Sequence, residues 1–185
     1  TYIKMHYIPA PYGILEDTFQ VYPGEYVNID SKGKLSKYIY WEFPALSEED
    51  LISDKEEALQ FLDSKLKESV KDQLEADVPL GTFLSGGIDS SLNAKLFSDK
   101  KDEVVKTFTI AFDSTSAAHT NEDGFAKKMS DSIGAQHFVK TVKTDEIINL
   151  LPKLIGYLGE PLADPVSGAQ YFVSKLARDN GVTVC

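Results

Sequence analysis

The residues whose types and spacing suggest chemistry lie in one short stretch, FLSGGIDSS, at positions 83–91. Its two glycines, Gly86 and Gly87, let a ligand approach the backbone closely, and their amides with those of a following helix can surround an anion. A bare phosphate would repel Asp89, so this carboxylate indicates a bridging Mg²⁺. The stretch therefore predicts a phosphate site with Asp89 as a metal ligand, and hydroxyls for the phosphate oxygens come from Ser85, Ser90 and Ser91.

A glycine turn with a Ser or Asp helix cap is the simpler explanation of a Gly-Gly pair alone. Seven consecutive residues of this chemistry, SGGIDSS, favour the phosphate site instead. No lysine precedes the serines, whereas a Walker A loop needs one to follow the γ-phosphate. The loop is therefore better suited to a pyrophosphate that leaves, and we expect Ile88 to pack between strand and helix.

The elements that must position this loop alternate along the chain from residue 77 onward. Apolar runs typical of strands occupy 77–84, 104–112 and 137–142, and another strand starts at 182–185; helical patterns occupy 89–100, 121–135, 144–158 and 168–180. The pattern predicts an α/β fold, a parallel sheet with helices on both faces. Ligands of such sheets bind at the carboxyl ends of the strands, where the loop lies.

The first third of the chain has a different character. Residues 1–46 are rich in Tyr, Pro and Gly, and 21–43 read as strand, turn, strand with Gly33 in the turn. We interpret them as a short β-rich arm, or as the end of something larger. Residues 47–76 predict a core-facing amphipathic helix with a capping box of Ser53 and Glu56. A later helix, 144–158, is expected to open on a Thr144 cap and contains Pro152.

Composition excludes several classes of protein. The chain has 185 residues, a net charge of -10 and 42% hydrophobic residues, as a globular domain does. It lacks the basic face of a nucleic-acid binder, and its charge makes a membrane surface an unsuitable partner. The one cysteine, Cys185, permits no internal disulfide, which fits the cytoplasmic location that we expect. The three histidines show no metal-ligand spacing.

The loop SGGIDSS resembles the pyrophosphate loop of the N-type ATP pyrophosphatases, which have an adenine nucleotide alpha-hydrolase-like fold. Its flanks resemble, in order, the synthetase domain of the glutamine-hydrolysing asparagine synthetases, in the stretches 76–96, 105–113, 121–138 and 159–184. Residues 1–43 resemble the end of that family's glutaminase domain and its linker. The resemblance implies two parts, 1–46 from the glutaminase-like domain and linker and 47–185 from the beginning of the synthetase domain.

The resemblance implies an ATP-dependent ligase. In the family, the side-chain carboxylate of aspartate attacks the α-phosphorus of ATP, giving β-aspartyl-AMP and pyrophosphate, and ammonia from glutamine then displaces AMP. The implied cofactors are ATP and Mg²⁺. The backbone of Ile110 matches the position that contacts adenine, and Leu84 lines the same pocket. The implied pyrophosphate ligands are Ser85, Gly86, Gly87, Asp89 and Ser90.

Three acids are further candidates for the active site. Glu122 matches the second member of an Asp-Glu pair in the family, although its neighbour here is Asn121. It reads equally well as an acid at a helix N-terminus, interacting with the helix dipole. Glu160 and Asp164 lie in a Pro-rich loop that either borders the acceptor pocket or is simply solvated. The family has an acid where Gly159 stands, which leaves the acceptor open.

Two family motifs are missing from the sequence. The glutaminase uses an N-terminal cysteine, whereas this chain starts with Thr1, and a second Ser-Gly-acid motif would follow Cys185. We therefore expect the ATP-binding half of a synthetase, inactive alone. The alternatives are an amidotransferase of the same superfamily acting on another carboxylate, or a degenerate nucleotide-binding domain. Dimerisation is left open.

Overall fold

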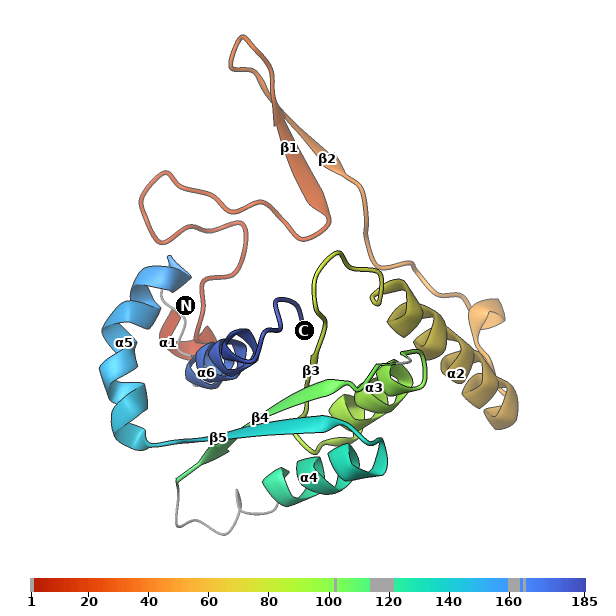
Figure 1. Ribbon diagram of the computed structural model, residues 1–185. Coiled ribbons are helices and arrows are strands. Elements are labelled where there is room, and N and C mark those ends of the chain that lie inside the picture. Colours follow the sequence, from red (N-terminus) through yellow and green to blue (C-terminus); the bar gives the residue numbers. More distant parts are fainter. Residues whose placement is uncertain (1, 102, 114–121, 160–163, 165) are drawn as a thin grey trace. The chain divides into compact units, whose positions relative to one another are not determined.

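The computed structural model describes all residues except 1, 102, 114–121, 160–163 and 165 (Figure 1). The described chain forms two compact units, one of Thr1–Ser53 with Ile155–Asp164 and one of Asp54–Leu154 with Pro165–Cys185. The first unit contains a short helix α1 (Tyr2–Met5), two strands and a 3-10 turn η1 (Glu48–Asp50). The second contains the sheet and the helices that position the loop at 85–91.

The strands of the first unit form the hairpin that the sequence predicts. Strand β1 (Glu25–Ile29) pairs antiparallel with β2 (Leu35–Ile39). Gly33 lies in the turn with a φ of 79°, a conformation that costs other residues energy. The rings of Tyr26 and Tyr38 stack across the two strands with centroids 5.1 Å apart.

The second unit is built on a parallel sheet in the order β3-β4-β5. Strand β4 (Lys106–Phe112) and strand β5 (Gln136–Val142) pair along their full lengths. Strand β3 (Thr82–Phe83) is far shorter than the predicted run 77–84, because Pro79 has no amide to donate to a sheet. The expected last strand is likewise only a bridge between Leu80 and Val184.

Helices cover both faces of this sheet, which confirms the predicted fold class (Figure 1). On one face, Leu84 packs with Ala94 of α3 (Ile88–Ser98) and Ala126 of α4 (Glu122–Ser132). On the other face, Phe108 packs with Val173 and Ala177 of α6 (Val166–Asp179). Residues of β4 alternate between these two layers, as the pleat of a strand requires.

The chain continues on both sides of β3, first on one edge of this strand and later on the other. The amide of Gly81 donates to the carbonyl of Val184, whereas the amide of Leu84 donates to that of Phe108 in β4. Since alternate amides of a strand point to opposite edges, Val184 and β4 lie on opposite edges of β3. Strands β4 and β5 are therefore added on one side of β3. The chain then returns through α6, over the face that contains Phe108, and reaches the opposite edge of β3 at Val184. In open α/β sheets, ligands bind at such a switch point.

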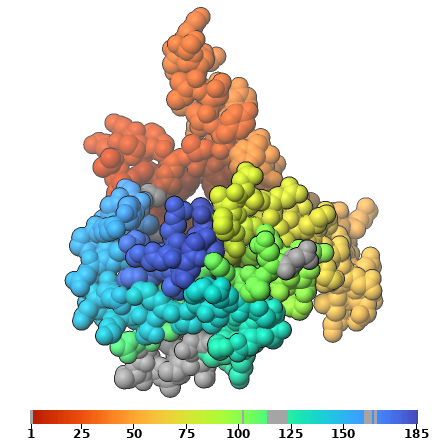
Figure 2. All heavy atoms as spheres, viewed as in Figure 1, coloured from red at the N-terminus to blue at the C-terminus, as the bar shows by residue number. Residues whose placement is uncertain are grey.

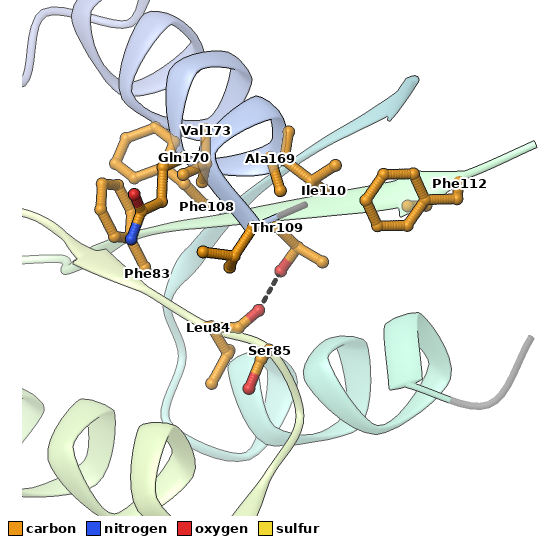
Figure 3. A pocket seen from close by; sticks show the side chains of 12 residues that line it. Phe83, Leu84, Ser85, Phe108, Thr109, Ile110, Phe112, Ala169, Gln170 and Val173 are labelled. Atoms are coloured by element: carbon orange, nitrogen blue, oxygen red, sulfur yellow. Dashed lines mark hydrogen bonds between the residues drawn. The ribbon is translucent and has the colours of Figure 1, made fainter. Parts of the chain in front are cut away.

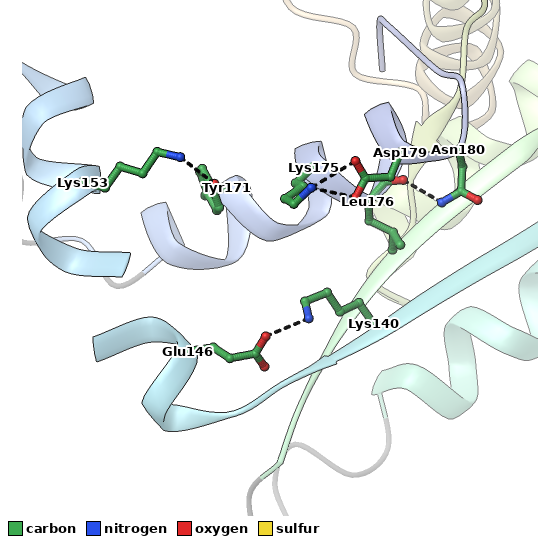
Figure 4. A network of polar contacts seen from close by, with 8 residues as sticks. All are labelled: Lys140, Glu146, Lys153, Tyr171, Lys175, Leu176, Asp179 and Asn180. Atoms are coloured by element: carbon green, nitrogen blue, oxygen red, sulfur yellow. Dashed lines mark hydrogen bonds and ion pairs between the residues drawn. The ribbon is translucent and has the colours of Figure 1, made fainter. Parts of the chain in front are cut away.

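Polar contacts fasten α5 (Thr144–Leu158) and α6 to the sheet (Figure 4). Lys140 of β5 reaches Glu146 at 2.9 Å, and its ammonium lies 5.4 Å from the ring centroid of Phe172. Lys153 donates to the hydroxyl of Tyr171 at 3.3 Å. In the space-filling view the atoms of α6, in dark blue, lie against light-blue atoms of α5 (Figure 2), where Leu150 and Leu154 pack with Phe172. This packing fixes the place of α6 over the strands.

Two predicted helix caps are each displaced by one residue, although α5 spans the predicted range 144–158. Helix α2 (Lys55–Asp72) is capped by Asp54, whose carboxylate accepts from the amide of Glu57, so the predicted Ser53 cap is wrong. Helix α5 begins after Lys143 rather than on a Thr144 cap. There Glu146 reaches back to the amide of Lys143 at 3.0 Å. At α2, Ser53 and Asp54 each have a glutamate three residues further on, Glu56 and Glu57, so the spacing alone does not locate the cap.

Helix α2 is not the core helix that its pattern predicts. None of its residues is buried, and Leu59 and Leu62 are 49% and 54% exposed. The half-buried part of the stripe, Leu66 and Val70, lies further along the helix. Periodicity predicts which face is apolar but not whether a neighbour covers it. Within the described part of the chain, no helix is long and apolar enough to cross a membrane.

Candidate nucleotide-binding site

The predicted phosphate loop lies at the carboxyl end of β3, where the chain turns into α3. Gly86 has a φ of 85°, and Gly87 is the residue that precedes the helix. The hydroxyls of Ser85 and Ser90 lie 2.9 Å apart, and that of Ser90 also donates to the carbonyl of Gly87 at 3.2 Å. The amide of Gly87 donates to the hydroxyl of Ser85 at 3.3 Å. These bonds close the loop on itself and fix its backbone.

The start of α3 offers free amides to an anion. The first amide that bonds within the helix is that of Ser91, to the carbonyl of Gly87 at 3.1 Å. The amides of Ile88, Asp89 and Ser90 have no partner within the helix, and Gly87 has no side chain to cap them. The helix dipole adds a partial positive charge at this end. The arrangement suits a polyphosphate.

An open cavity of about 300 Å³ adjoins the loop (Figure 3). It lies between the ends of β3 and β4 and the first turns of α6. Among its lining residues, Ser85 belongs to the phosphate loop, and Leu84 and Ile110 are the residues expected near adenine. Most of the lining is apolar, with aromatic rings from Phe83, Phe108 and Phe112 and with Ala111, Val166, Ala169 and Val173. Such a cavity suits a planar base.

The polar groups of the lining are Ser85, Thr109 and Gln170. Thr109 is 4% exposed, and its hydroxyl donates to the carbonyl of Leu84, the bond drawn in Figure 3. Leu84 itself is 1% exposed. This bond joins β4 to the last residue before the loop. It therefore ties the cavity wall to the phosphate-binding backbone.

One sequence expectation at the loop is wrong. Ile88 does not pack between strand and helix but is 86% exposed. It is the first residue of α3, and side chains of a helix tilt toward its N-terminus, here away from the sheet. The space between strand and helix is filled by Leu84 and Ala94 instead.

The sequence reasoning also missed the contribution of α6 to the cavity. Val166, Ala169, Gln170 and Val173 enter the lining from a helix that begins some 75 residues after the loop. The sequence contains only an indirect signal for this contribution. The chain has to come back across the sheet after β5 to reach the strand expected at 182–185, and the predicted helix 168–180 is the segment that does so. The pattern of α6 alone did not distinguish lining residues from ordinary packing.

The acidic candidates are placed unequally. Asp89 is exposed at the start of α3, beside the free amides. Glu122 begins α4, but its side chain and the whole of Glu160 lie outside the described residues. Asp164 is exposed and belongs to the first unit. That Glu122, Glu160 and Asp164 belong to an active site stays a prediction.

The donor set fits a magnesium ion that arrives with a nucleotide. Among the described residues, no group of three His, Cys, Asp or Glu side chains could hold a metal. Mg²⁺ is commonly held by one or two carboxylates together with substrate phosphates. Asp89 supplies one carboxylate at the place where the amides would hold those phosphates. Of the residues in the phosphate loop, Asp89 is therefore the one that would hold Mg²⁺.

The model of the family described as asparagine synthase matches residues 62–185. Asparagine synthetase [glutamine-hydrolyzing] 1 of Bacillus subtilis is 30% identical over 187 residues, covering 99% of this chain and 28% of that protein. A putative asparagine synthetase of Methanocaldococcus jannaschii is 31% identical over 179 residues, covering 96% and 33%. The chain thus spans about a third or less of these relatives.

Among solved structures, the NH3-dependent NAD synthetase from Campylobacter jejuni has a TM-score of 0.43 and 15% identity to this chain. The match covers 68% of this chain and 54% of that one.

Proposed function

The chain belongs to the asparagine synthase family, and from this premise we propose that it is the ATP-binding part of an amide-forming ligase. The observation that carries the proposal is that Ser85 belongs both to the cavity and to the phosphate loop. It lines the base-sized cavity and also closes the loop through Ser90. A nucleotide with its base in the cavity would have its phosphates at the start of α3.

In the proposed reaction, a carboxylate oxygen of aspartate attacks the α-phosphorus, and the bond to the β-phosphate oxygen breaks. The products are an acyl-adenylate and pyrophosphate; ammonia derived from glutamine then displaces AMP and leaves the amide. The chain's own part is electrostatic. The amides of Ile88, Asp89 and Ser90 and the hydroxyls of Ser85, Ser90 and Ser91 would stabilise the charge that develops on pyrophosphate.

Asp89 would hold Mg²⁺ against the phosphates, and the ion would supply additional positive charge to the leaving group. The apolar cavity would orient the nucleotide and exclude water from the base. The backbones of Ile110 and Leu84 would contact the base there, because the side chain of Leu84 is buried on the other face of the sheet. The acceptor and the ammonia source rest on the family relationship rather than on any residue of the site.

Titration calorimetry of the 185-residue chain with ATP, with and without Mg²⁺, tests the proposal. We expect saturable binding, and we expect Asp89→Ala to weaken Mg-ATP binding about tenfold, the size of a charge-assisted contact. Metal-free ATP should lose less. The matched control is Asp99→Ala, at the other end of α3, where the carboxylate only pairs with Lys95 on the surface. Equal loss with and without metal would rule out the metal role of Asp89.

The acceptor is tested separately, by pyrophosphate release from the full-length ligase in the presence of a panel of free carboxylic acids, because we expect the 185-residue chain alone to be inactive. We expect release to depend on aspartate. Release with a different acid alone would reassign the acceptor while leaving the nucleotide site intact.

A further inference from the structure

The side chain of Gln170 is chemically unlike the rest of the cavity that it lines. It extends from the first half of α6 toward β3, with its amide at the cavity (Figure 3). The neighbouring lining residues of the same helix, Val166, Ala169 and Val173, are apolar. A primary amide carries two donors and an acceptor, so it adds hydrogen-bonding capacity to a wall that otherwise has little.

The other two polar groups of the lining are already engaged. The hydroxyl of Thr109 donates to the carbonyl of Leu84. That of Ser85 is paired with Ser90 and accepts from the amide of Gly87, and with a nucleotide bound it would serve the phosphates rather than the base. Within the described part of the chain, the amide of Gln170 makes no hydrogen bond, and the residue is exposed. Its amide is therefore available to a ligand.

We propose that Gln170 is a base-selecting residue, whose side-chain oxygen accepts a hydrogen bond from the exocyclic amino group of adenine while its NH₂ donates to an adjacent ring nitrogen. This proposal rests on the proposed ATP site and goes beyond it. Glutamine and adenine have matching donor and acceptor patterns, as their pairing on DNA shows. A base bound beside Phe83 and Ile110 would cover the amide of Gln170 and make this bond out of water, where it counts for more.

The test is a chemical double-mutant cycle on the 185-residue chain. Binding of ATP is compared with that of purine riboside triphosphate, which lacks only the amino group, both with Mg²⁺. For the unaltered chain we expect the missing amino group to weaken binding about tenfold, the scale of one hydrogen bond left unmade. In Gln170→Leu the same change should matter less than about twofold. Gln170→Glu keeps the acceptor and should restore the discrimination.

Lys175→Leu is the matched control, since it also replaces an exposed polar residue of α6 by leucine but outside the cavity. It should leave the ratio of the two affinities unchanged. The ratio distinguishes recognition from a general effect on folding, because a distorted helix would weaken both nucleotides together. If ATP binds and the ratio of the two nucleotide affinities is the same in the unaltered chain and in Gln170→Leu, the proposal is overturned. Failure of the unaltered chain to bind either nucleotide would refute the ATP site itself, and this inference with it.

Discussion

Replacing Thr109 by valine tests whether the bond from β4 holds the start of the phosphate loop. The substitution keeps the shape of the side chain and removes only its hydroxyl, so it leaves no cavity. The carbonyl of Leu84 then loses the one donor that the described hydrogen bonds give it. Because Leu84 is 1% exposed and Thr109 4%, water does not readily replace the hydroxyl. An unsatisfied buried acceptor costs about 1–3 kcal/mol.

We expect urea denaturation of Thr109→Val to show a loss of that size, with an unchanged dependence on denaturant. The control is Thr183→Val, because Thr183 is exposed and its hydroxyl only accepts from Arg178 at 3.3 Å. This surface change should stay within about 0.5 kcal/mol. If the two valine variants lose equally little stability, the carbonyl of Leu84 is satisfied in some other way and the reasoning fails.

Two more predictions concern titration and capping. Burial, with a smaller contribution from the charge of Lys127, lowers the pKa of His137 below its ordinary value of 6.5. The unfolded chain therefore binds the extra proton, and stability should fall as the pH drops from about 6.5 through the lowered pKa. Urea denaturation at several pH values should show that the stability of His137→Asn falls less steeply with decreasing pH than that of the unaltered chain. If both proteins lose stability in parallel, His137 is not the group responsible. Asp54→Ala should weaken the first turn of α2 by about 1 kcal/mol. The hydrogen-exchange rate of the Glu57 amide measures this loss. Ser53→Ala should leave that rate unchanged. A larger effect of Ser53→Ala than of Asp54→Ala would show that Ser53 is the cap after all.

The parts of the fold that the sequence predicted are those in which local pattern and tertiary environment agree. The run 104–112 shows almost no alternation because helices cover both faces of β4 (Figure 1). Gly33 marks a turn because few other residues adopt its φ without cost. The phosphate loop was located by the same logic, since its chemistry stood between a strand and a helix.

The failures share a different cause. The position of Ile88 and the exposure of α2 depend on which neighbours are present, and a single sequence contains no record of them. The cavity depends even more on which elements are neighbours in the fold. Ser85 and Gln170 face one space only because α6 returns over β4, and no motif links two residues so far apart in the chain.

The bridge between Leu80 and Val184 has a consequence for the order of folding. It joins residues roughly a hundred positions apart, whereas β4 and β5 pair over a separation of about thirty. Contacts between distant residues cost more chain entropy to close, so they form late. The strand–helix units from β3 to β5 can assemble first, and α6 can settle on the sheet only afterwards. During synthesis the phosphate loop therefore emerges early, while the cavity beside it exists only after the return of α6.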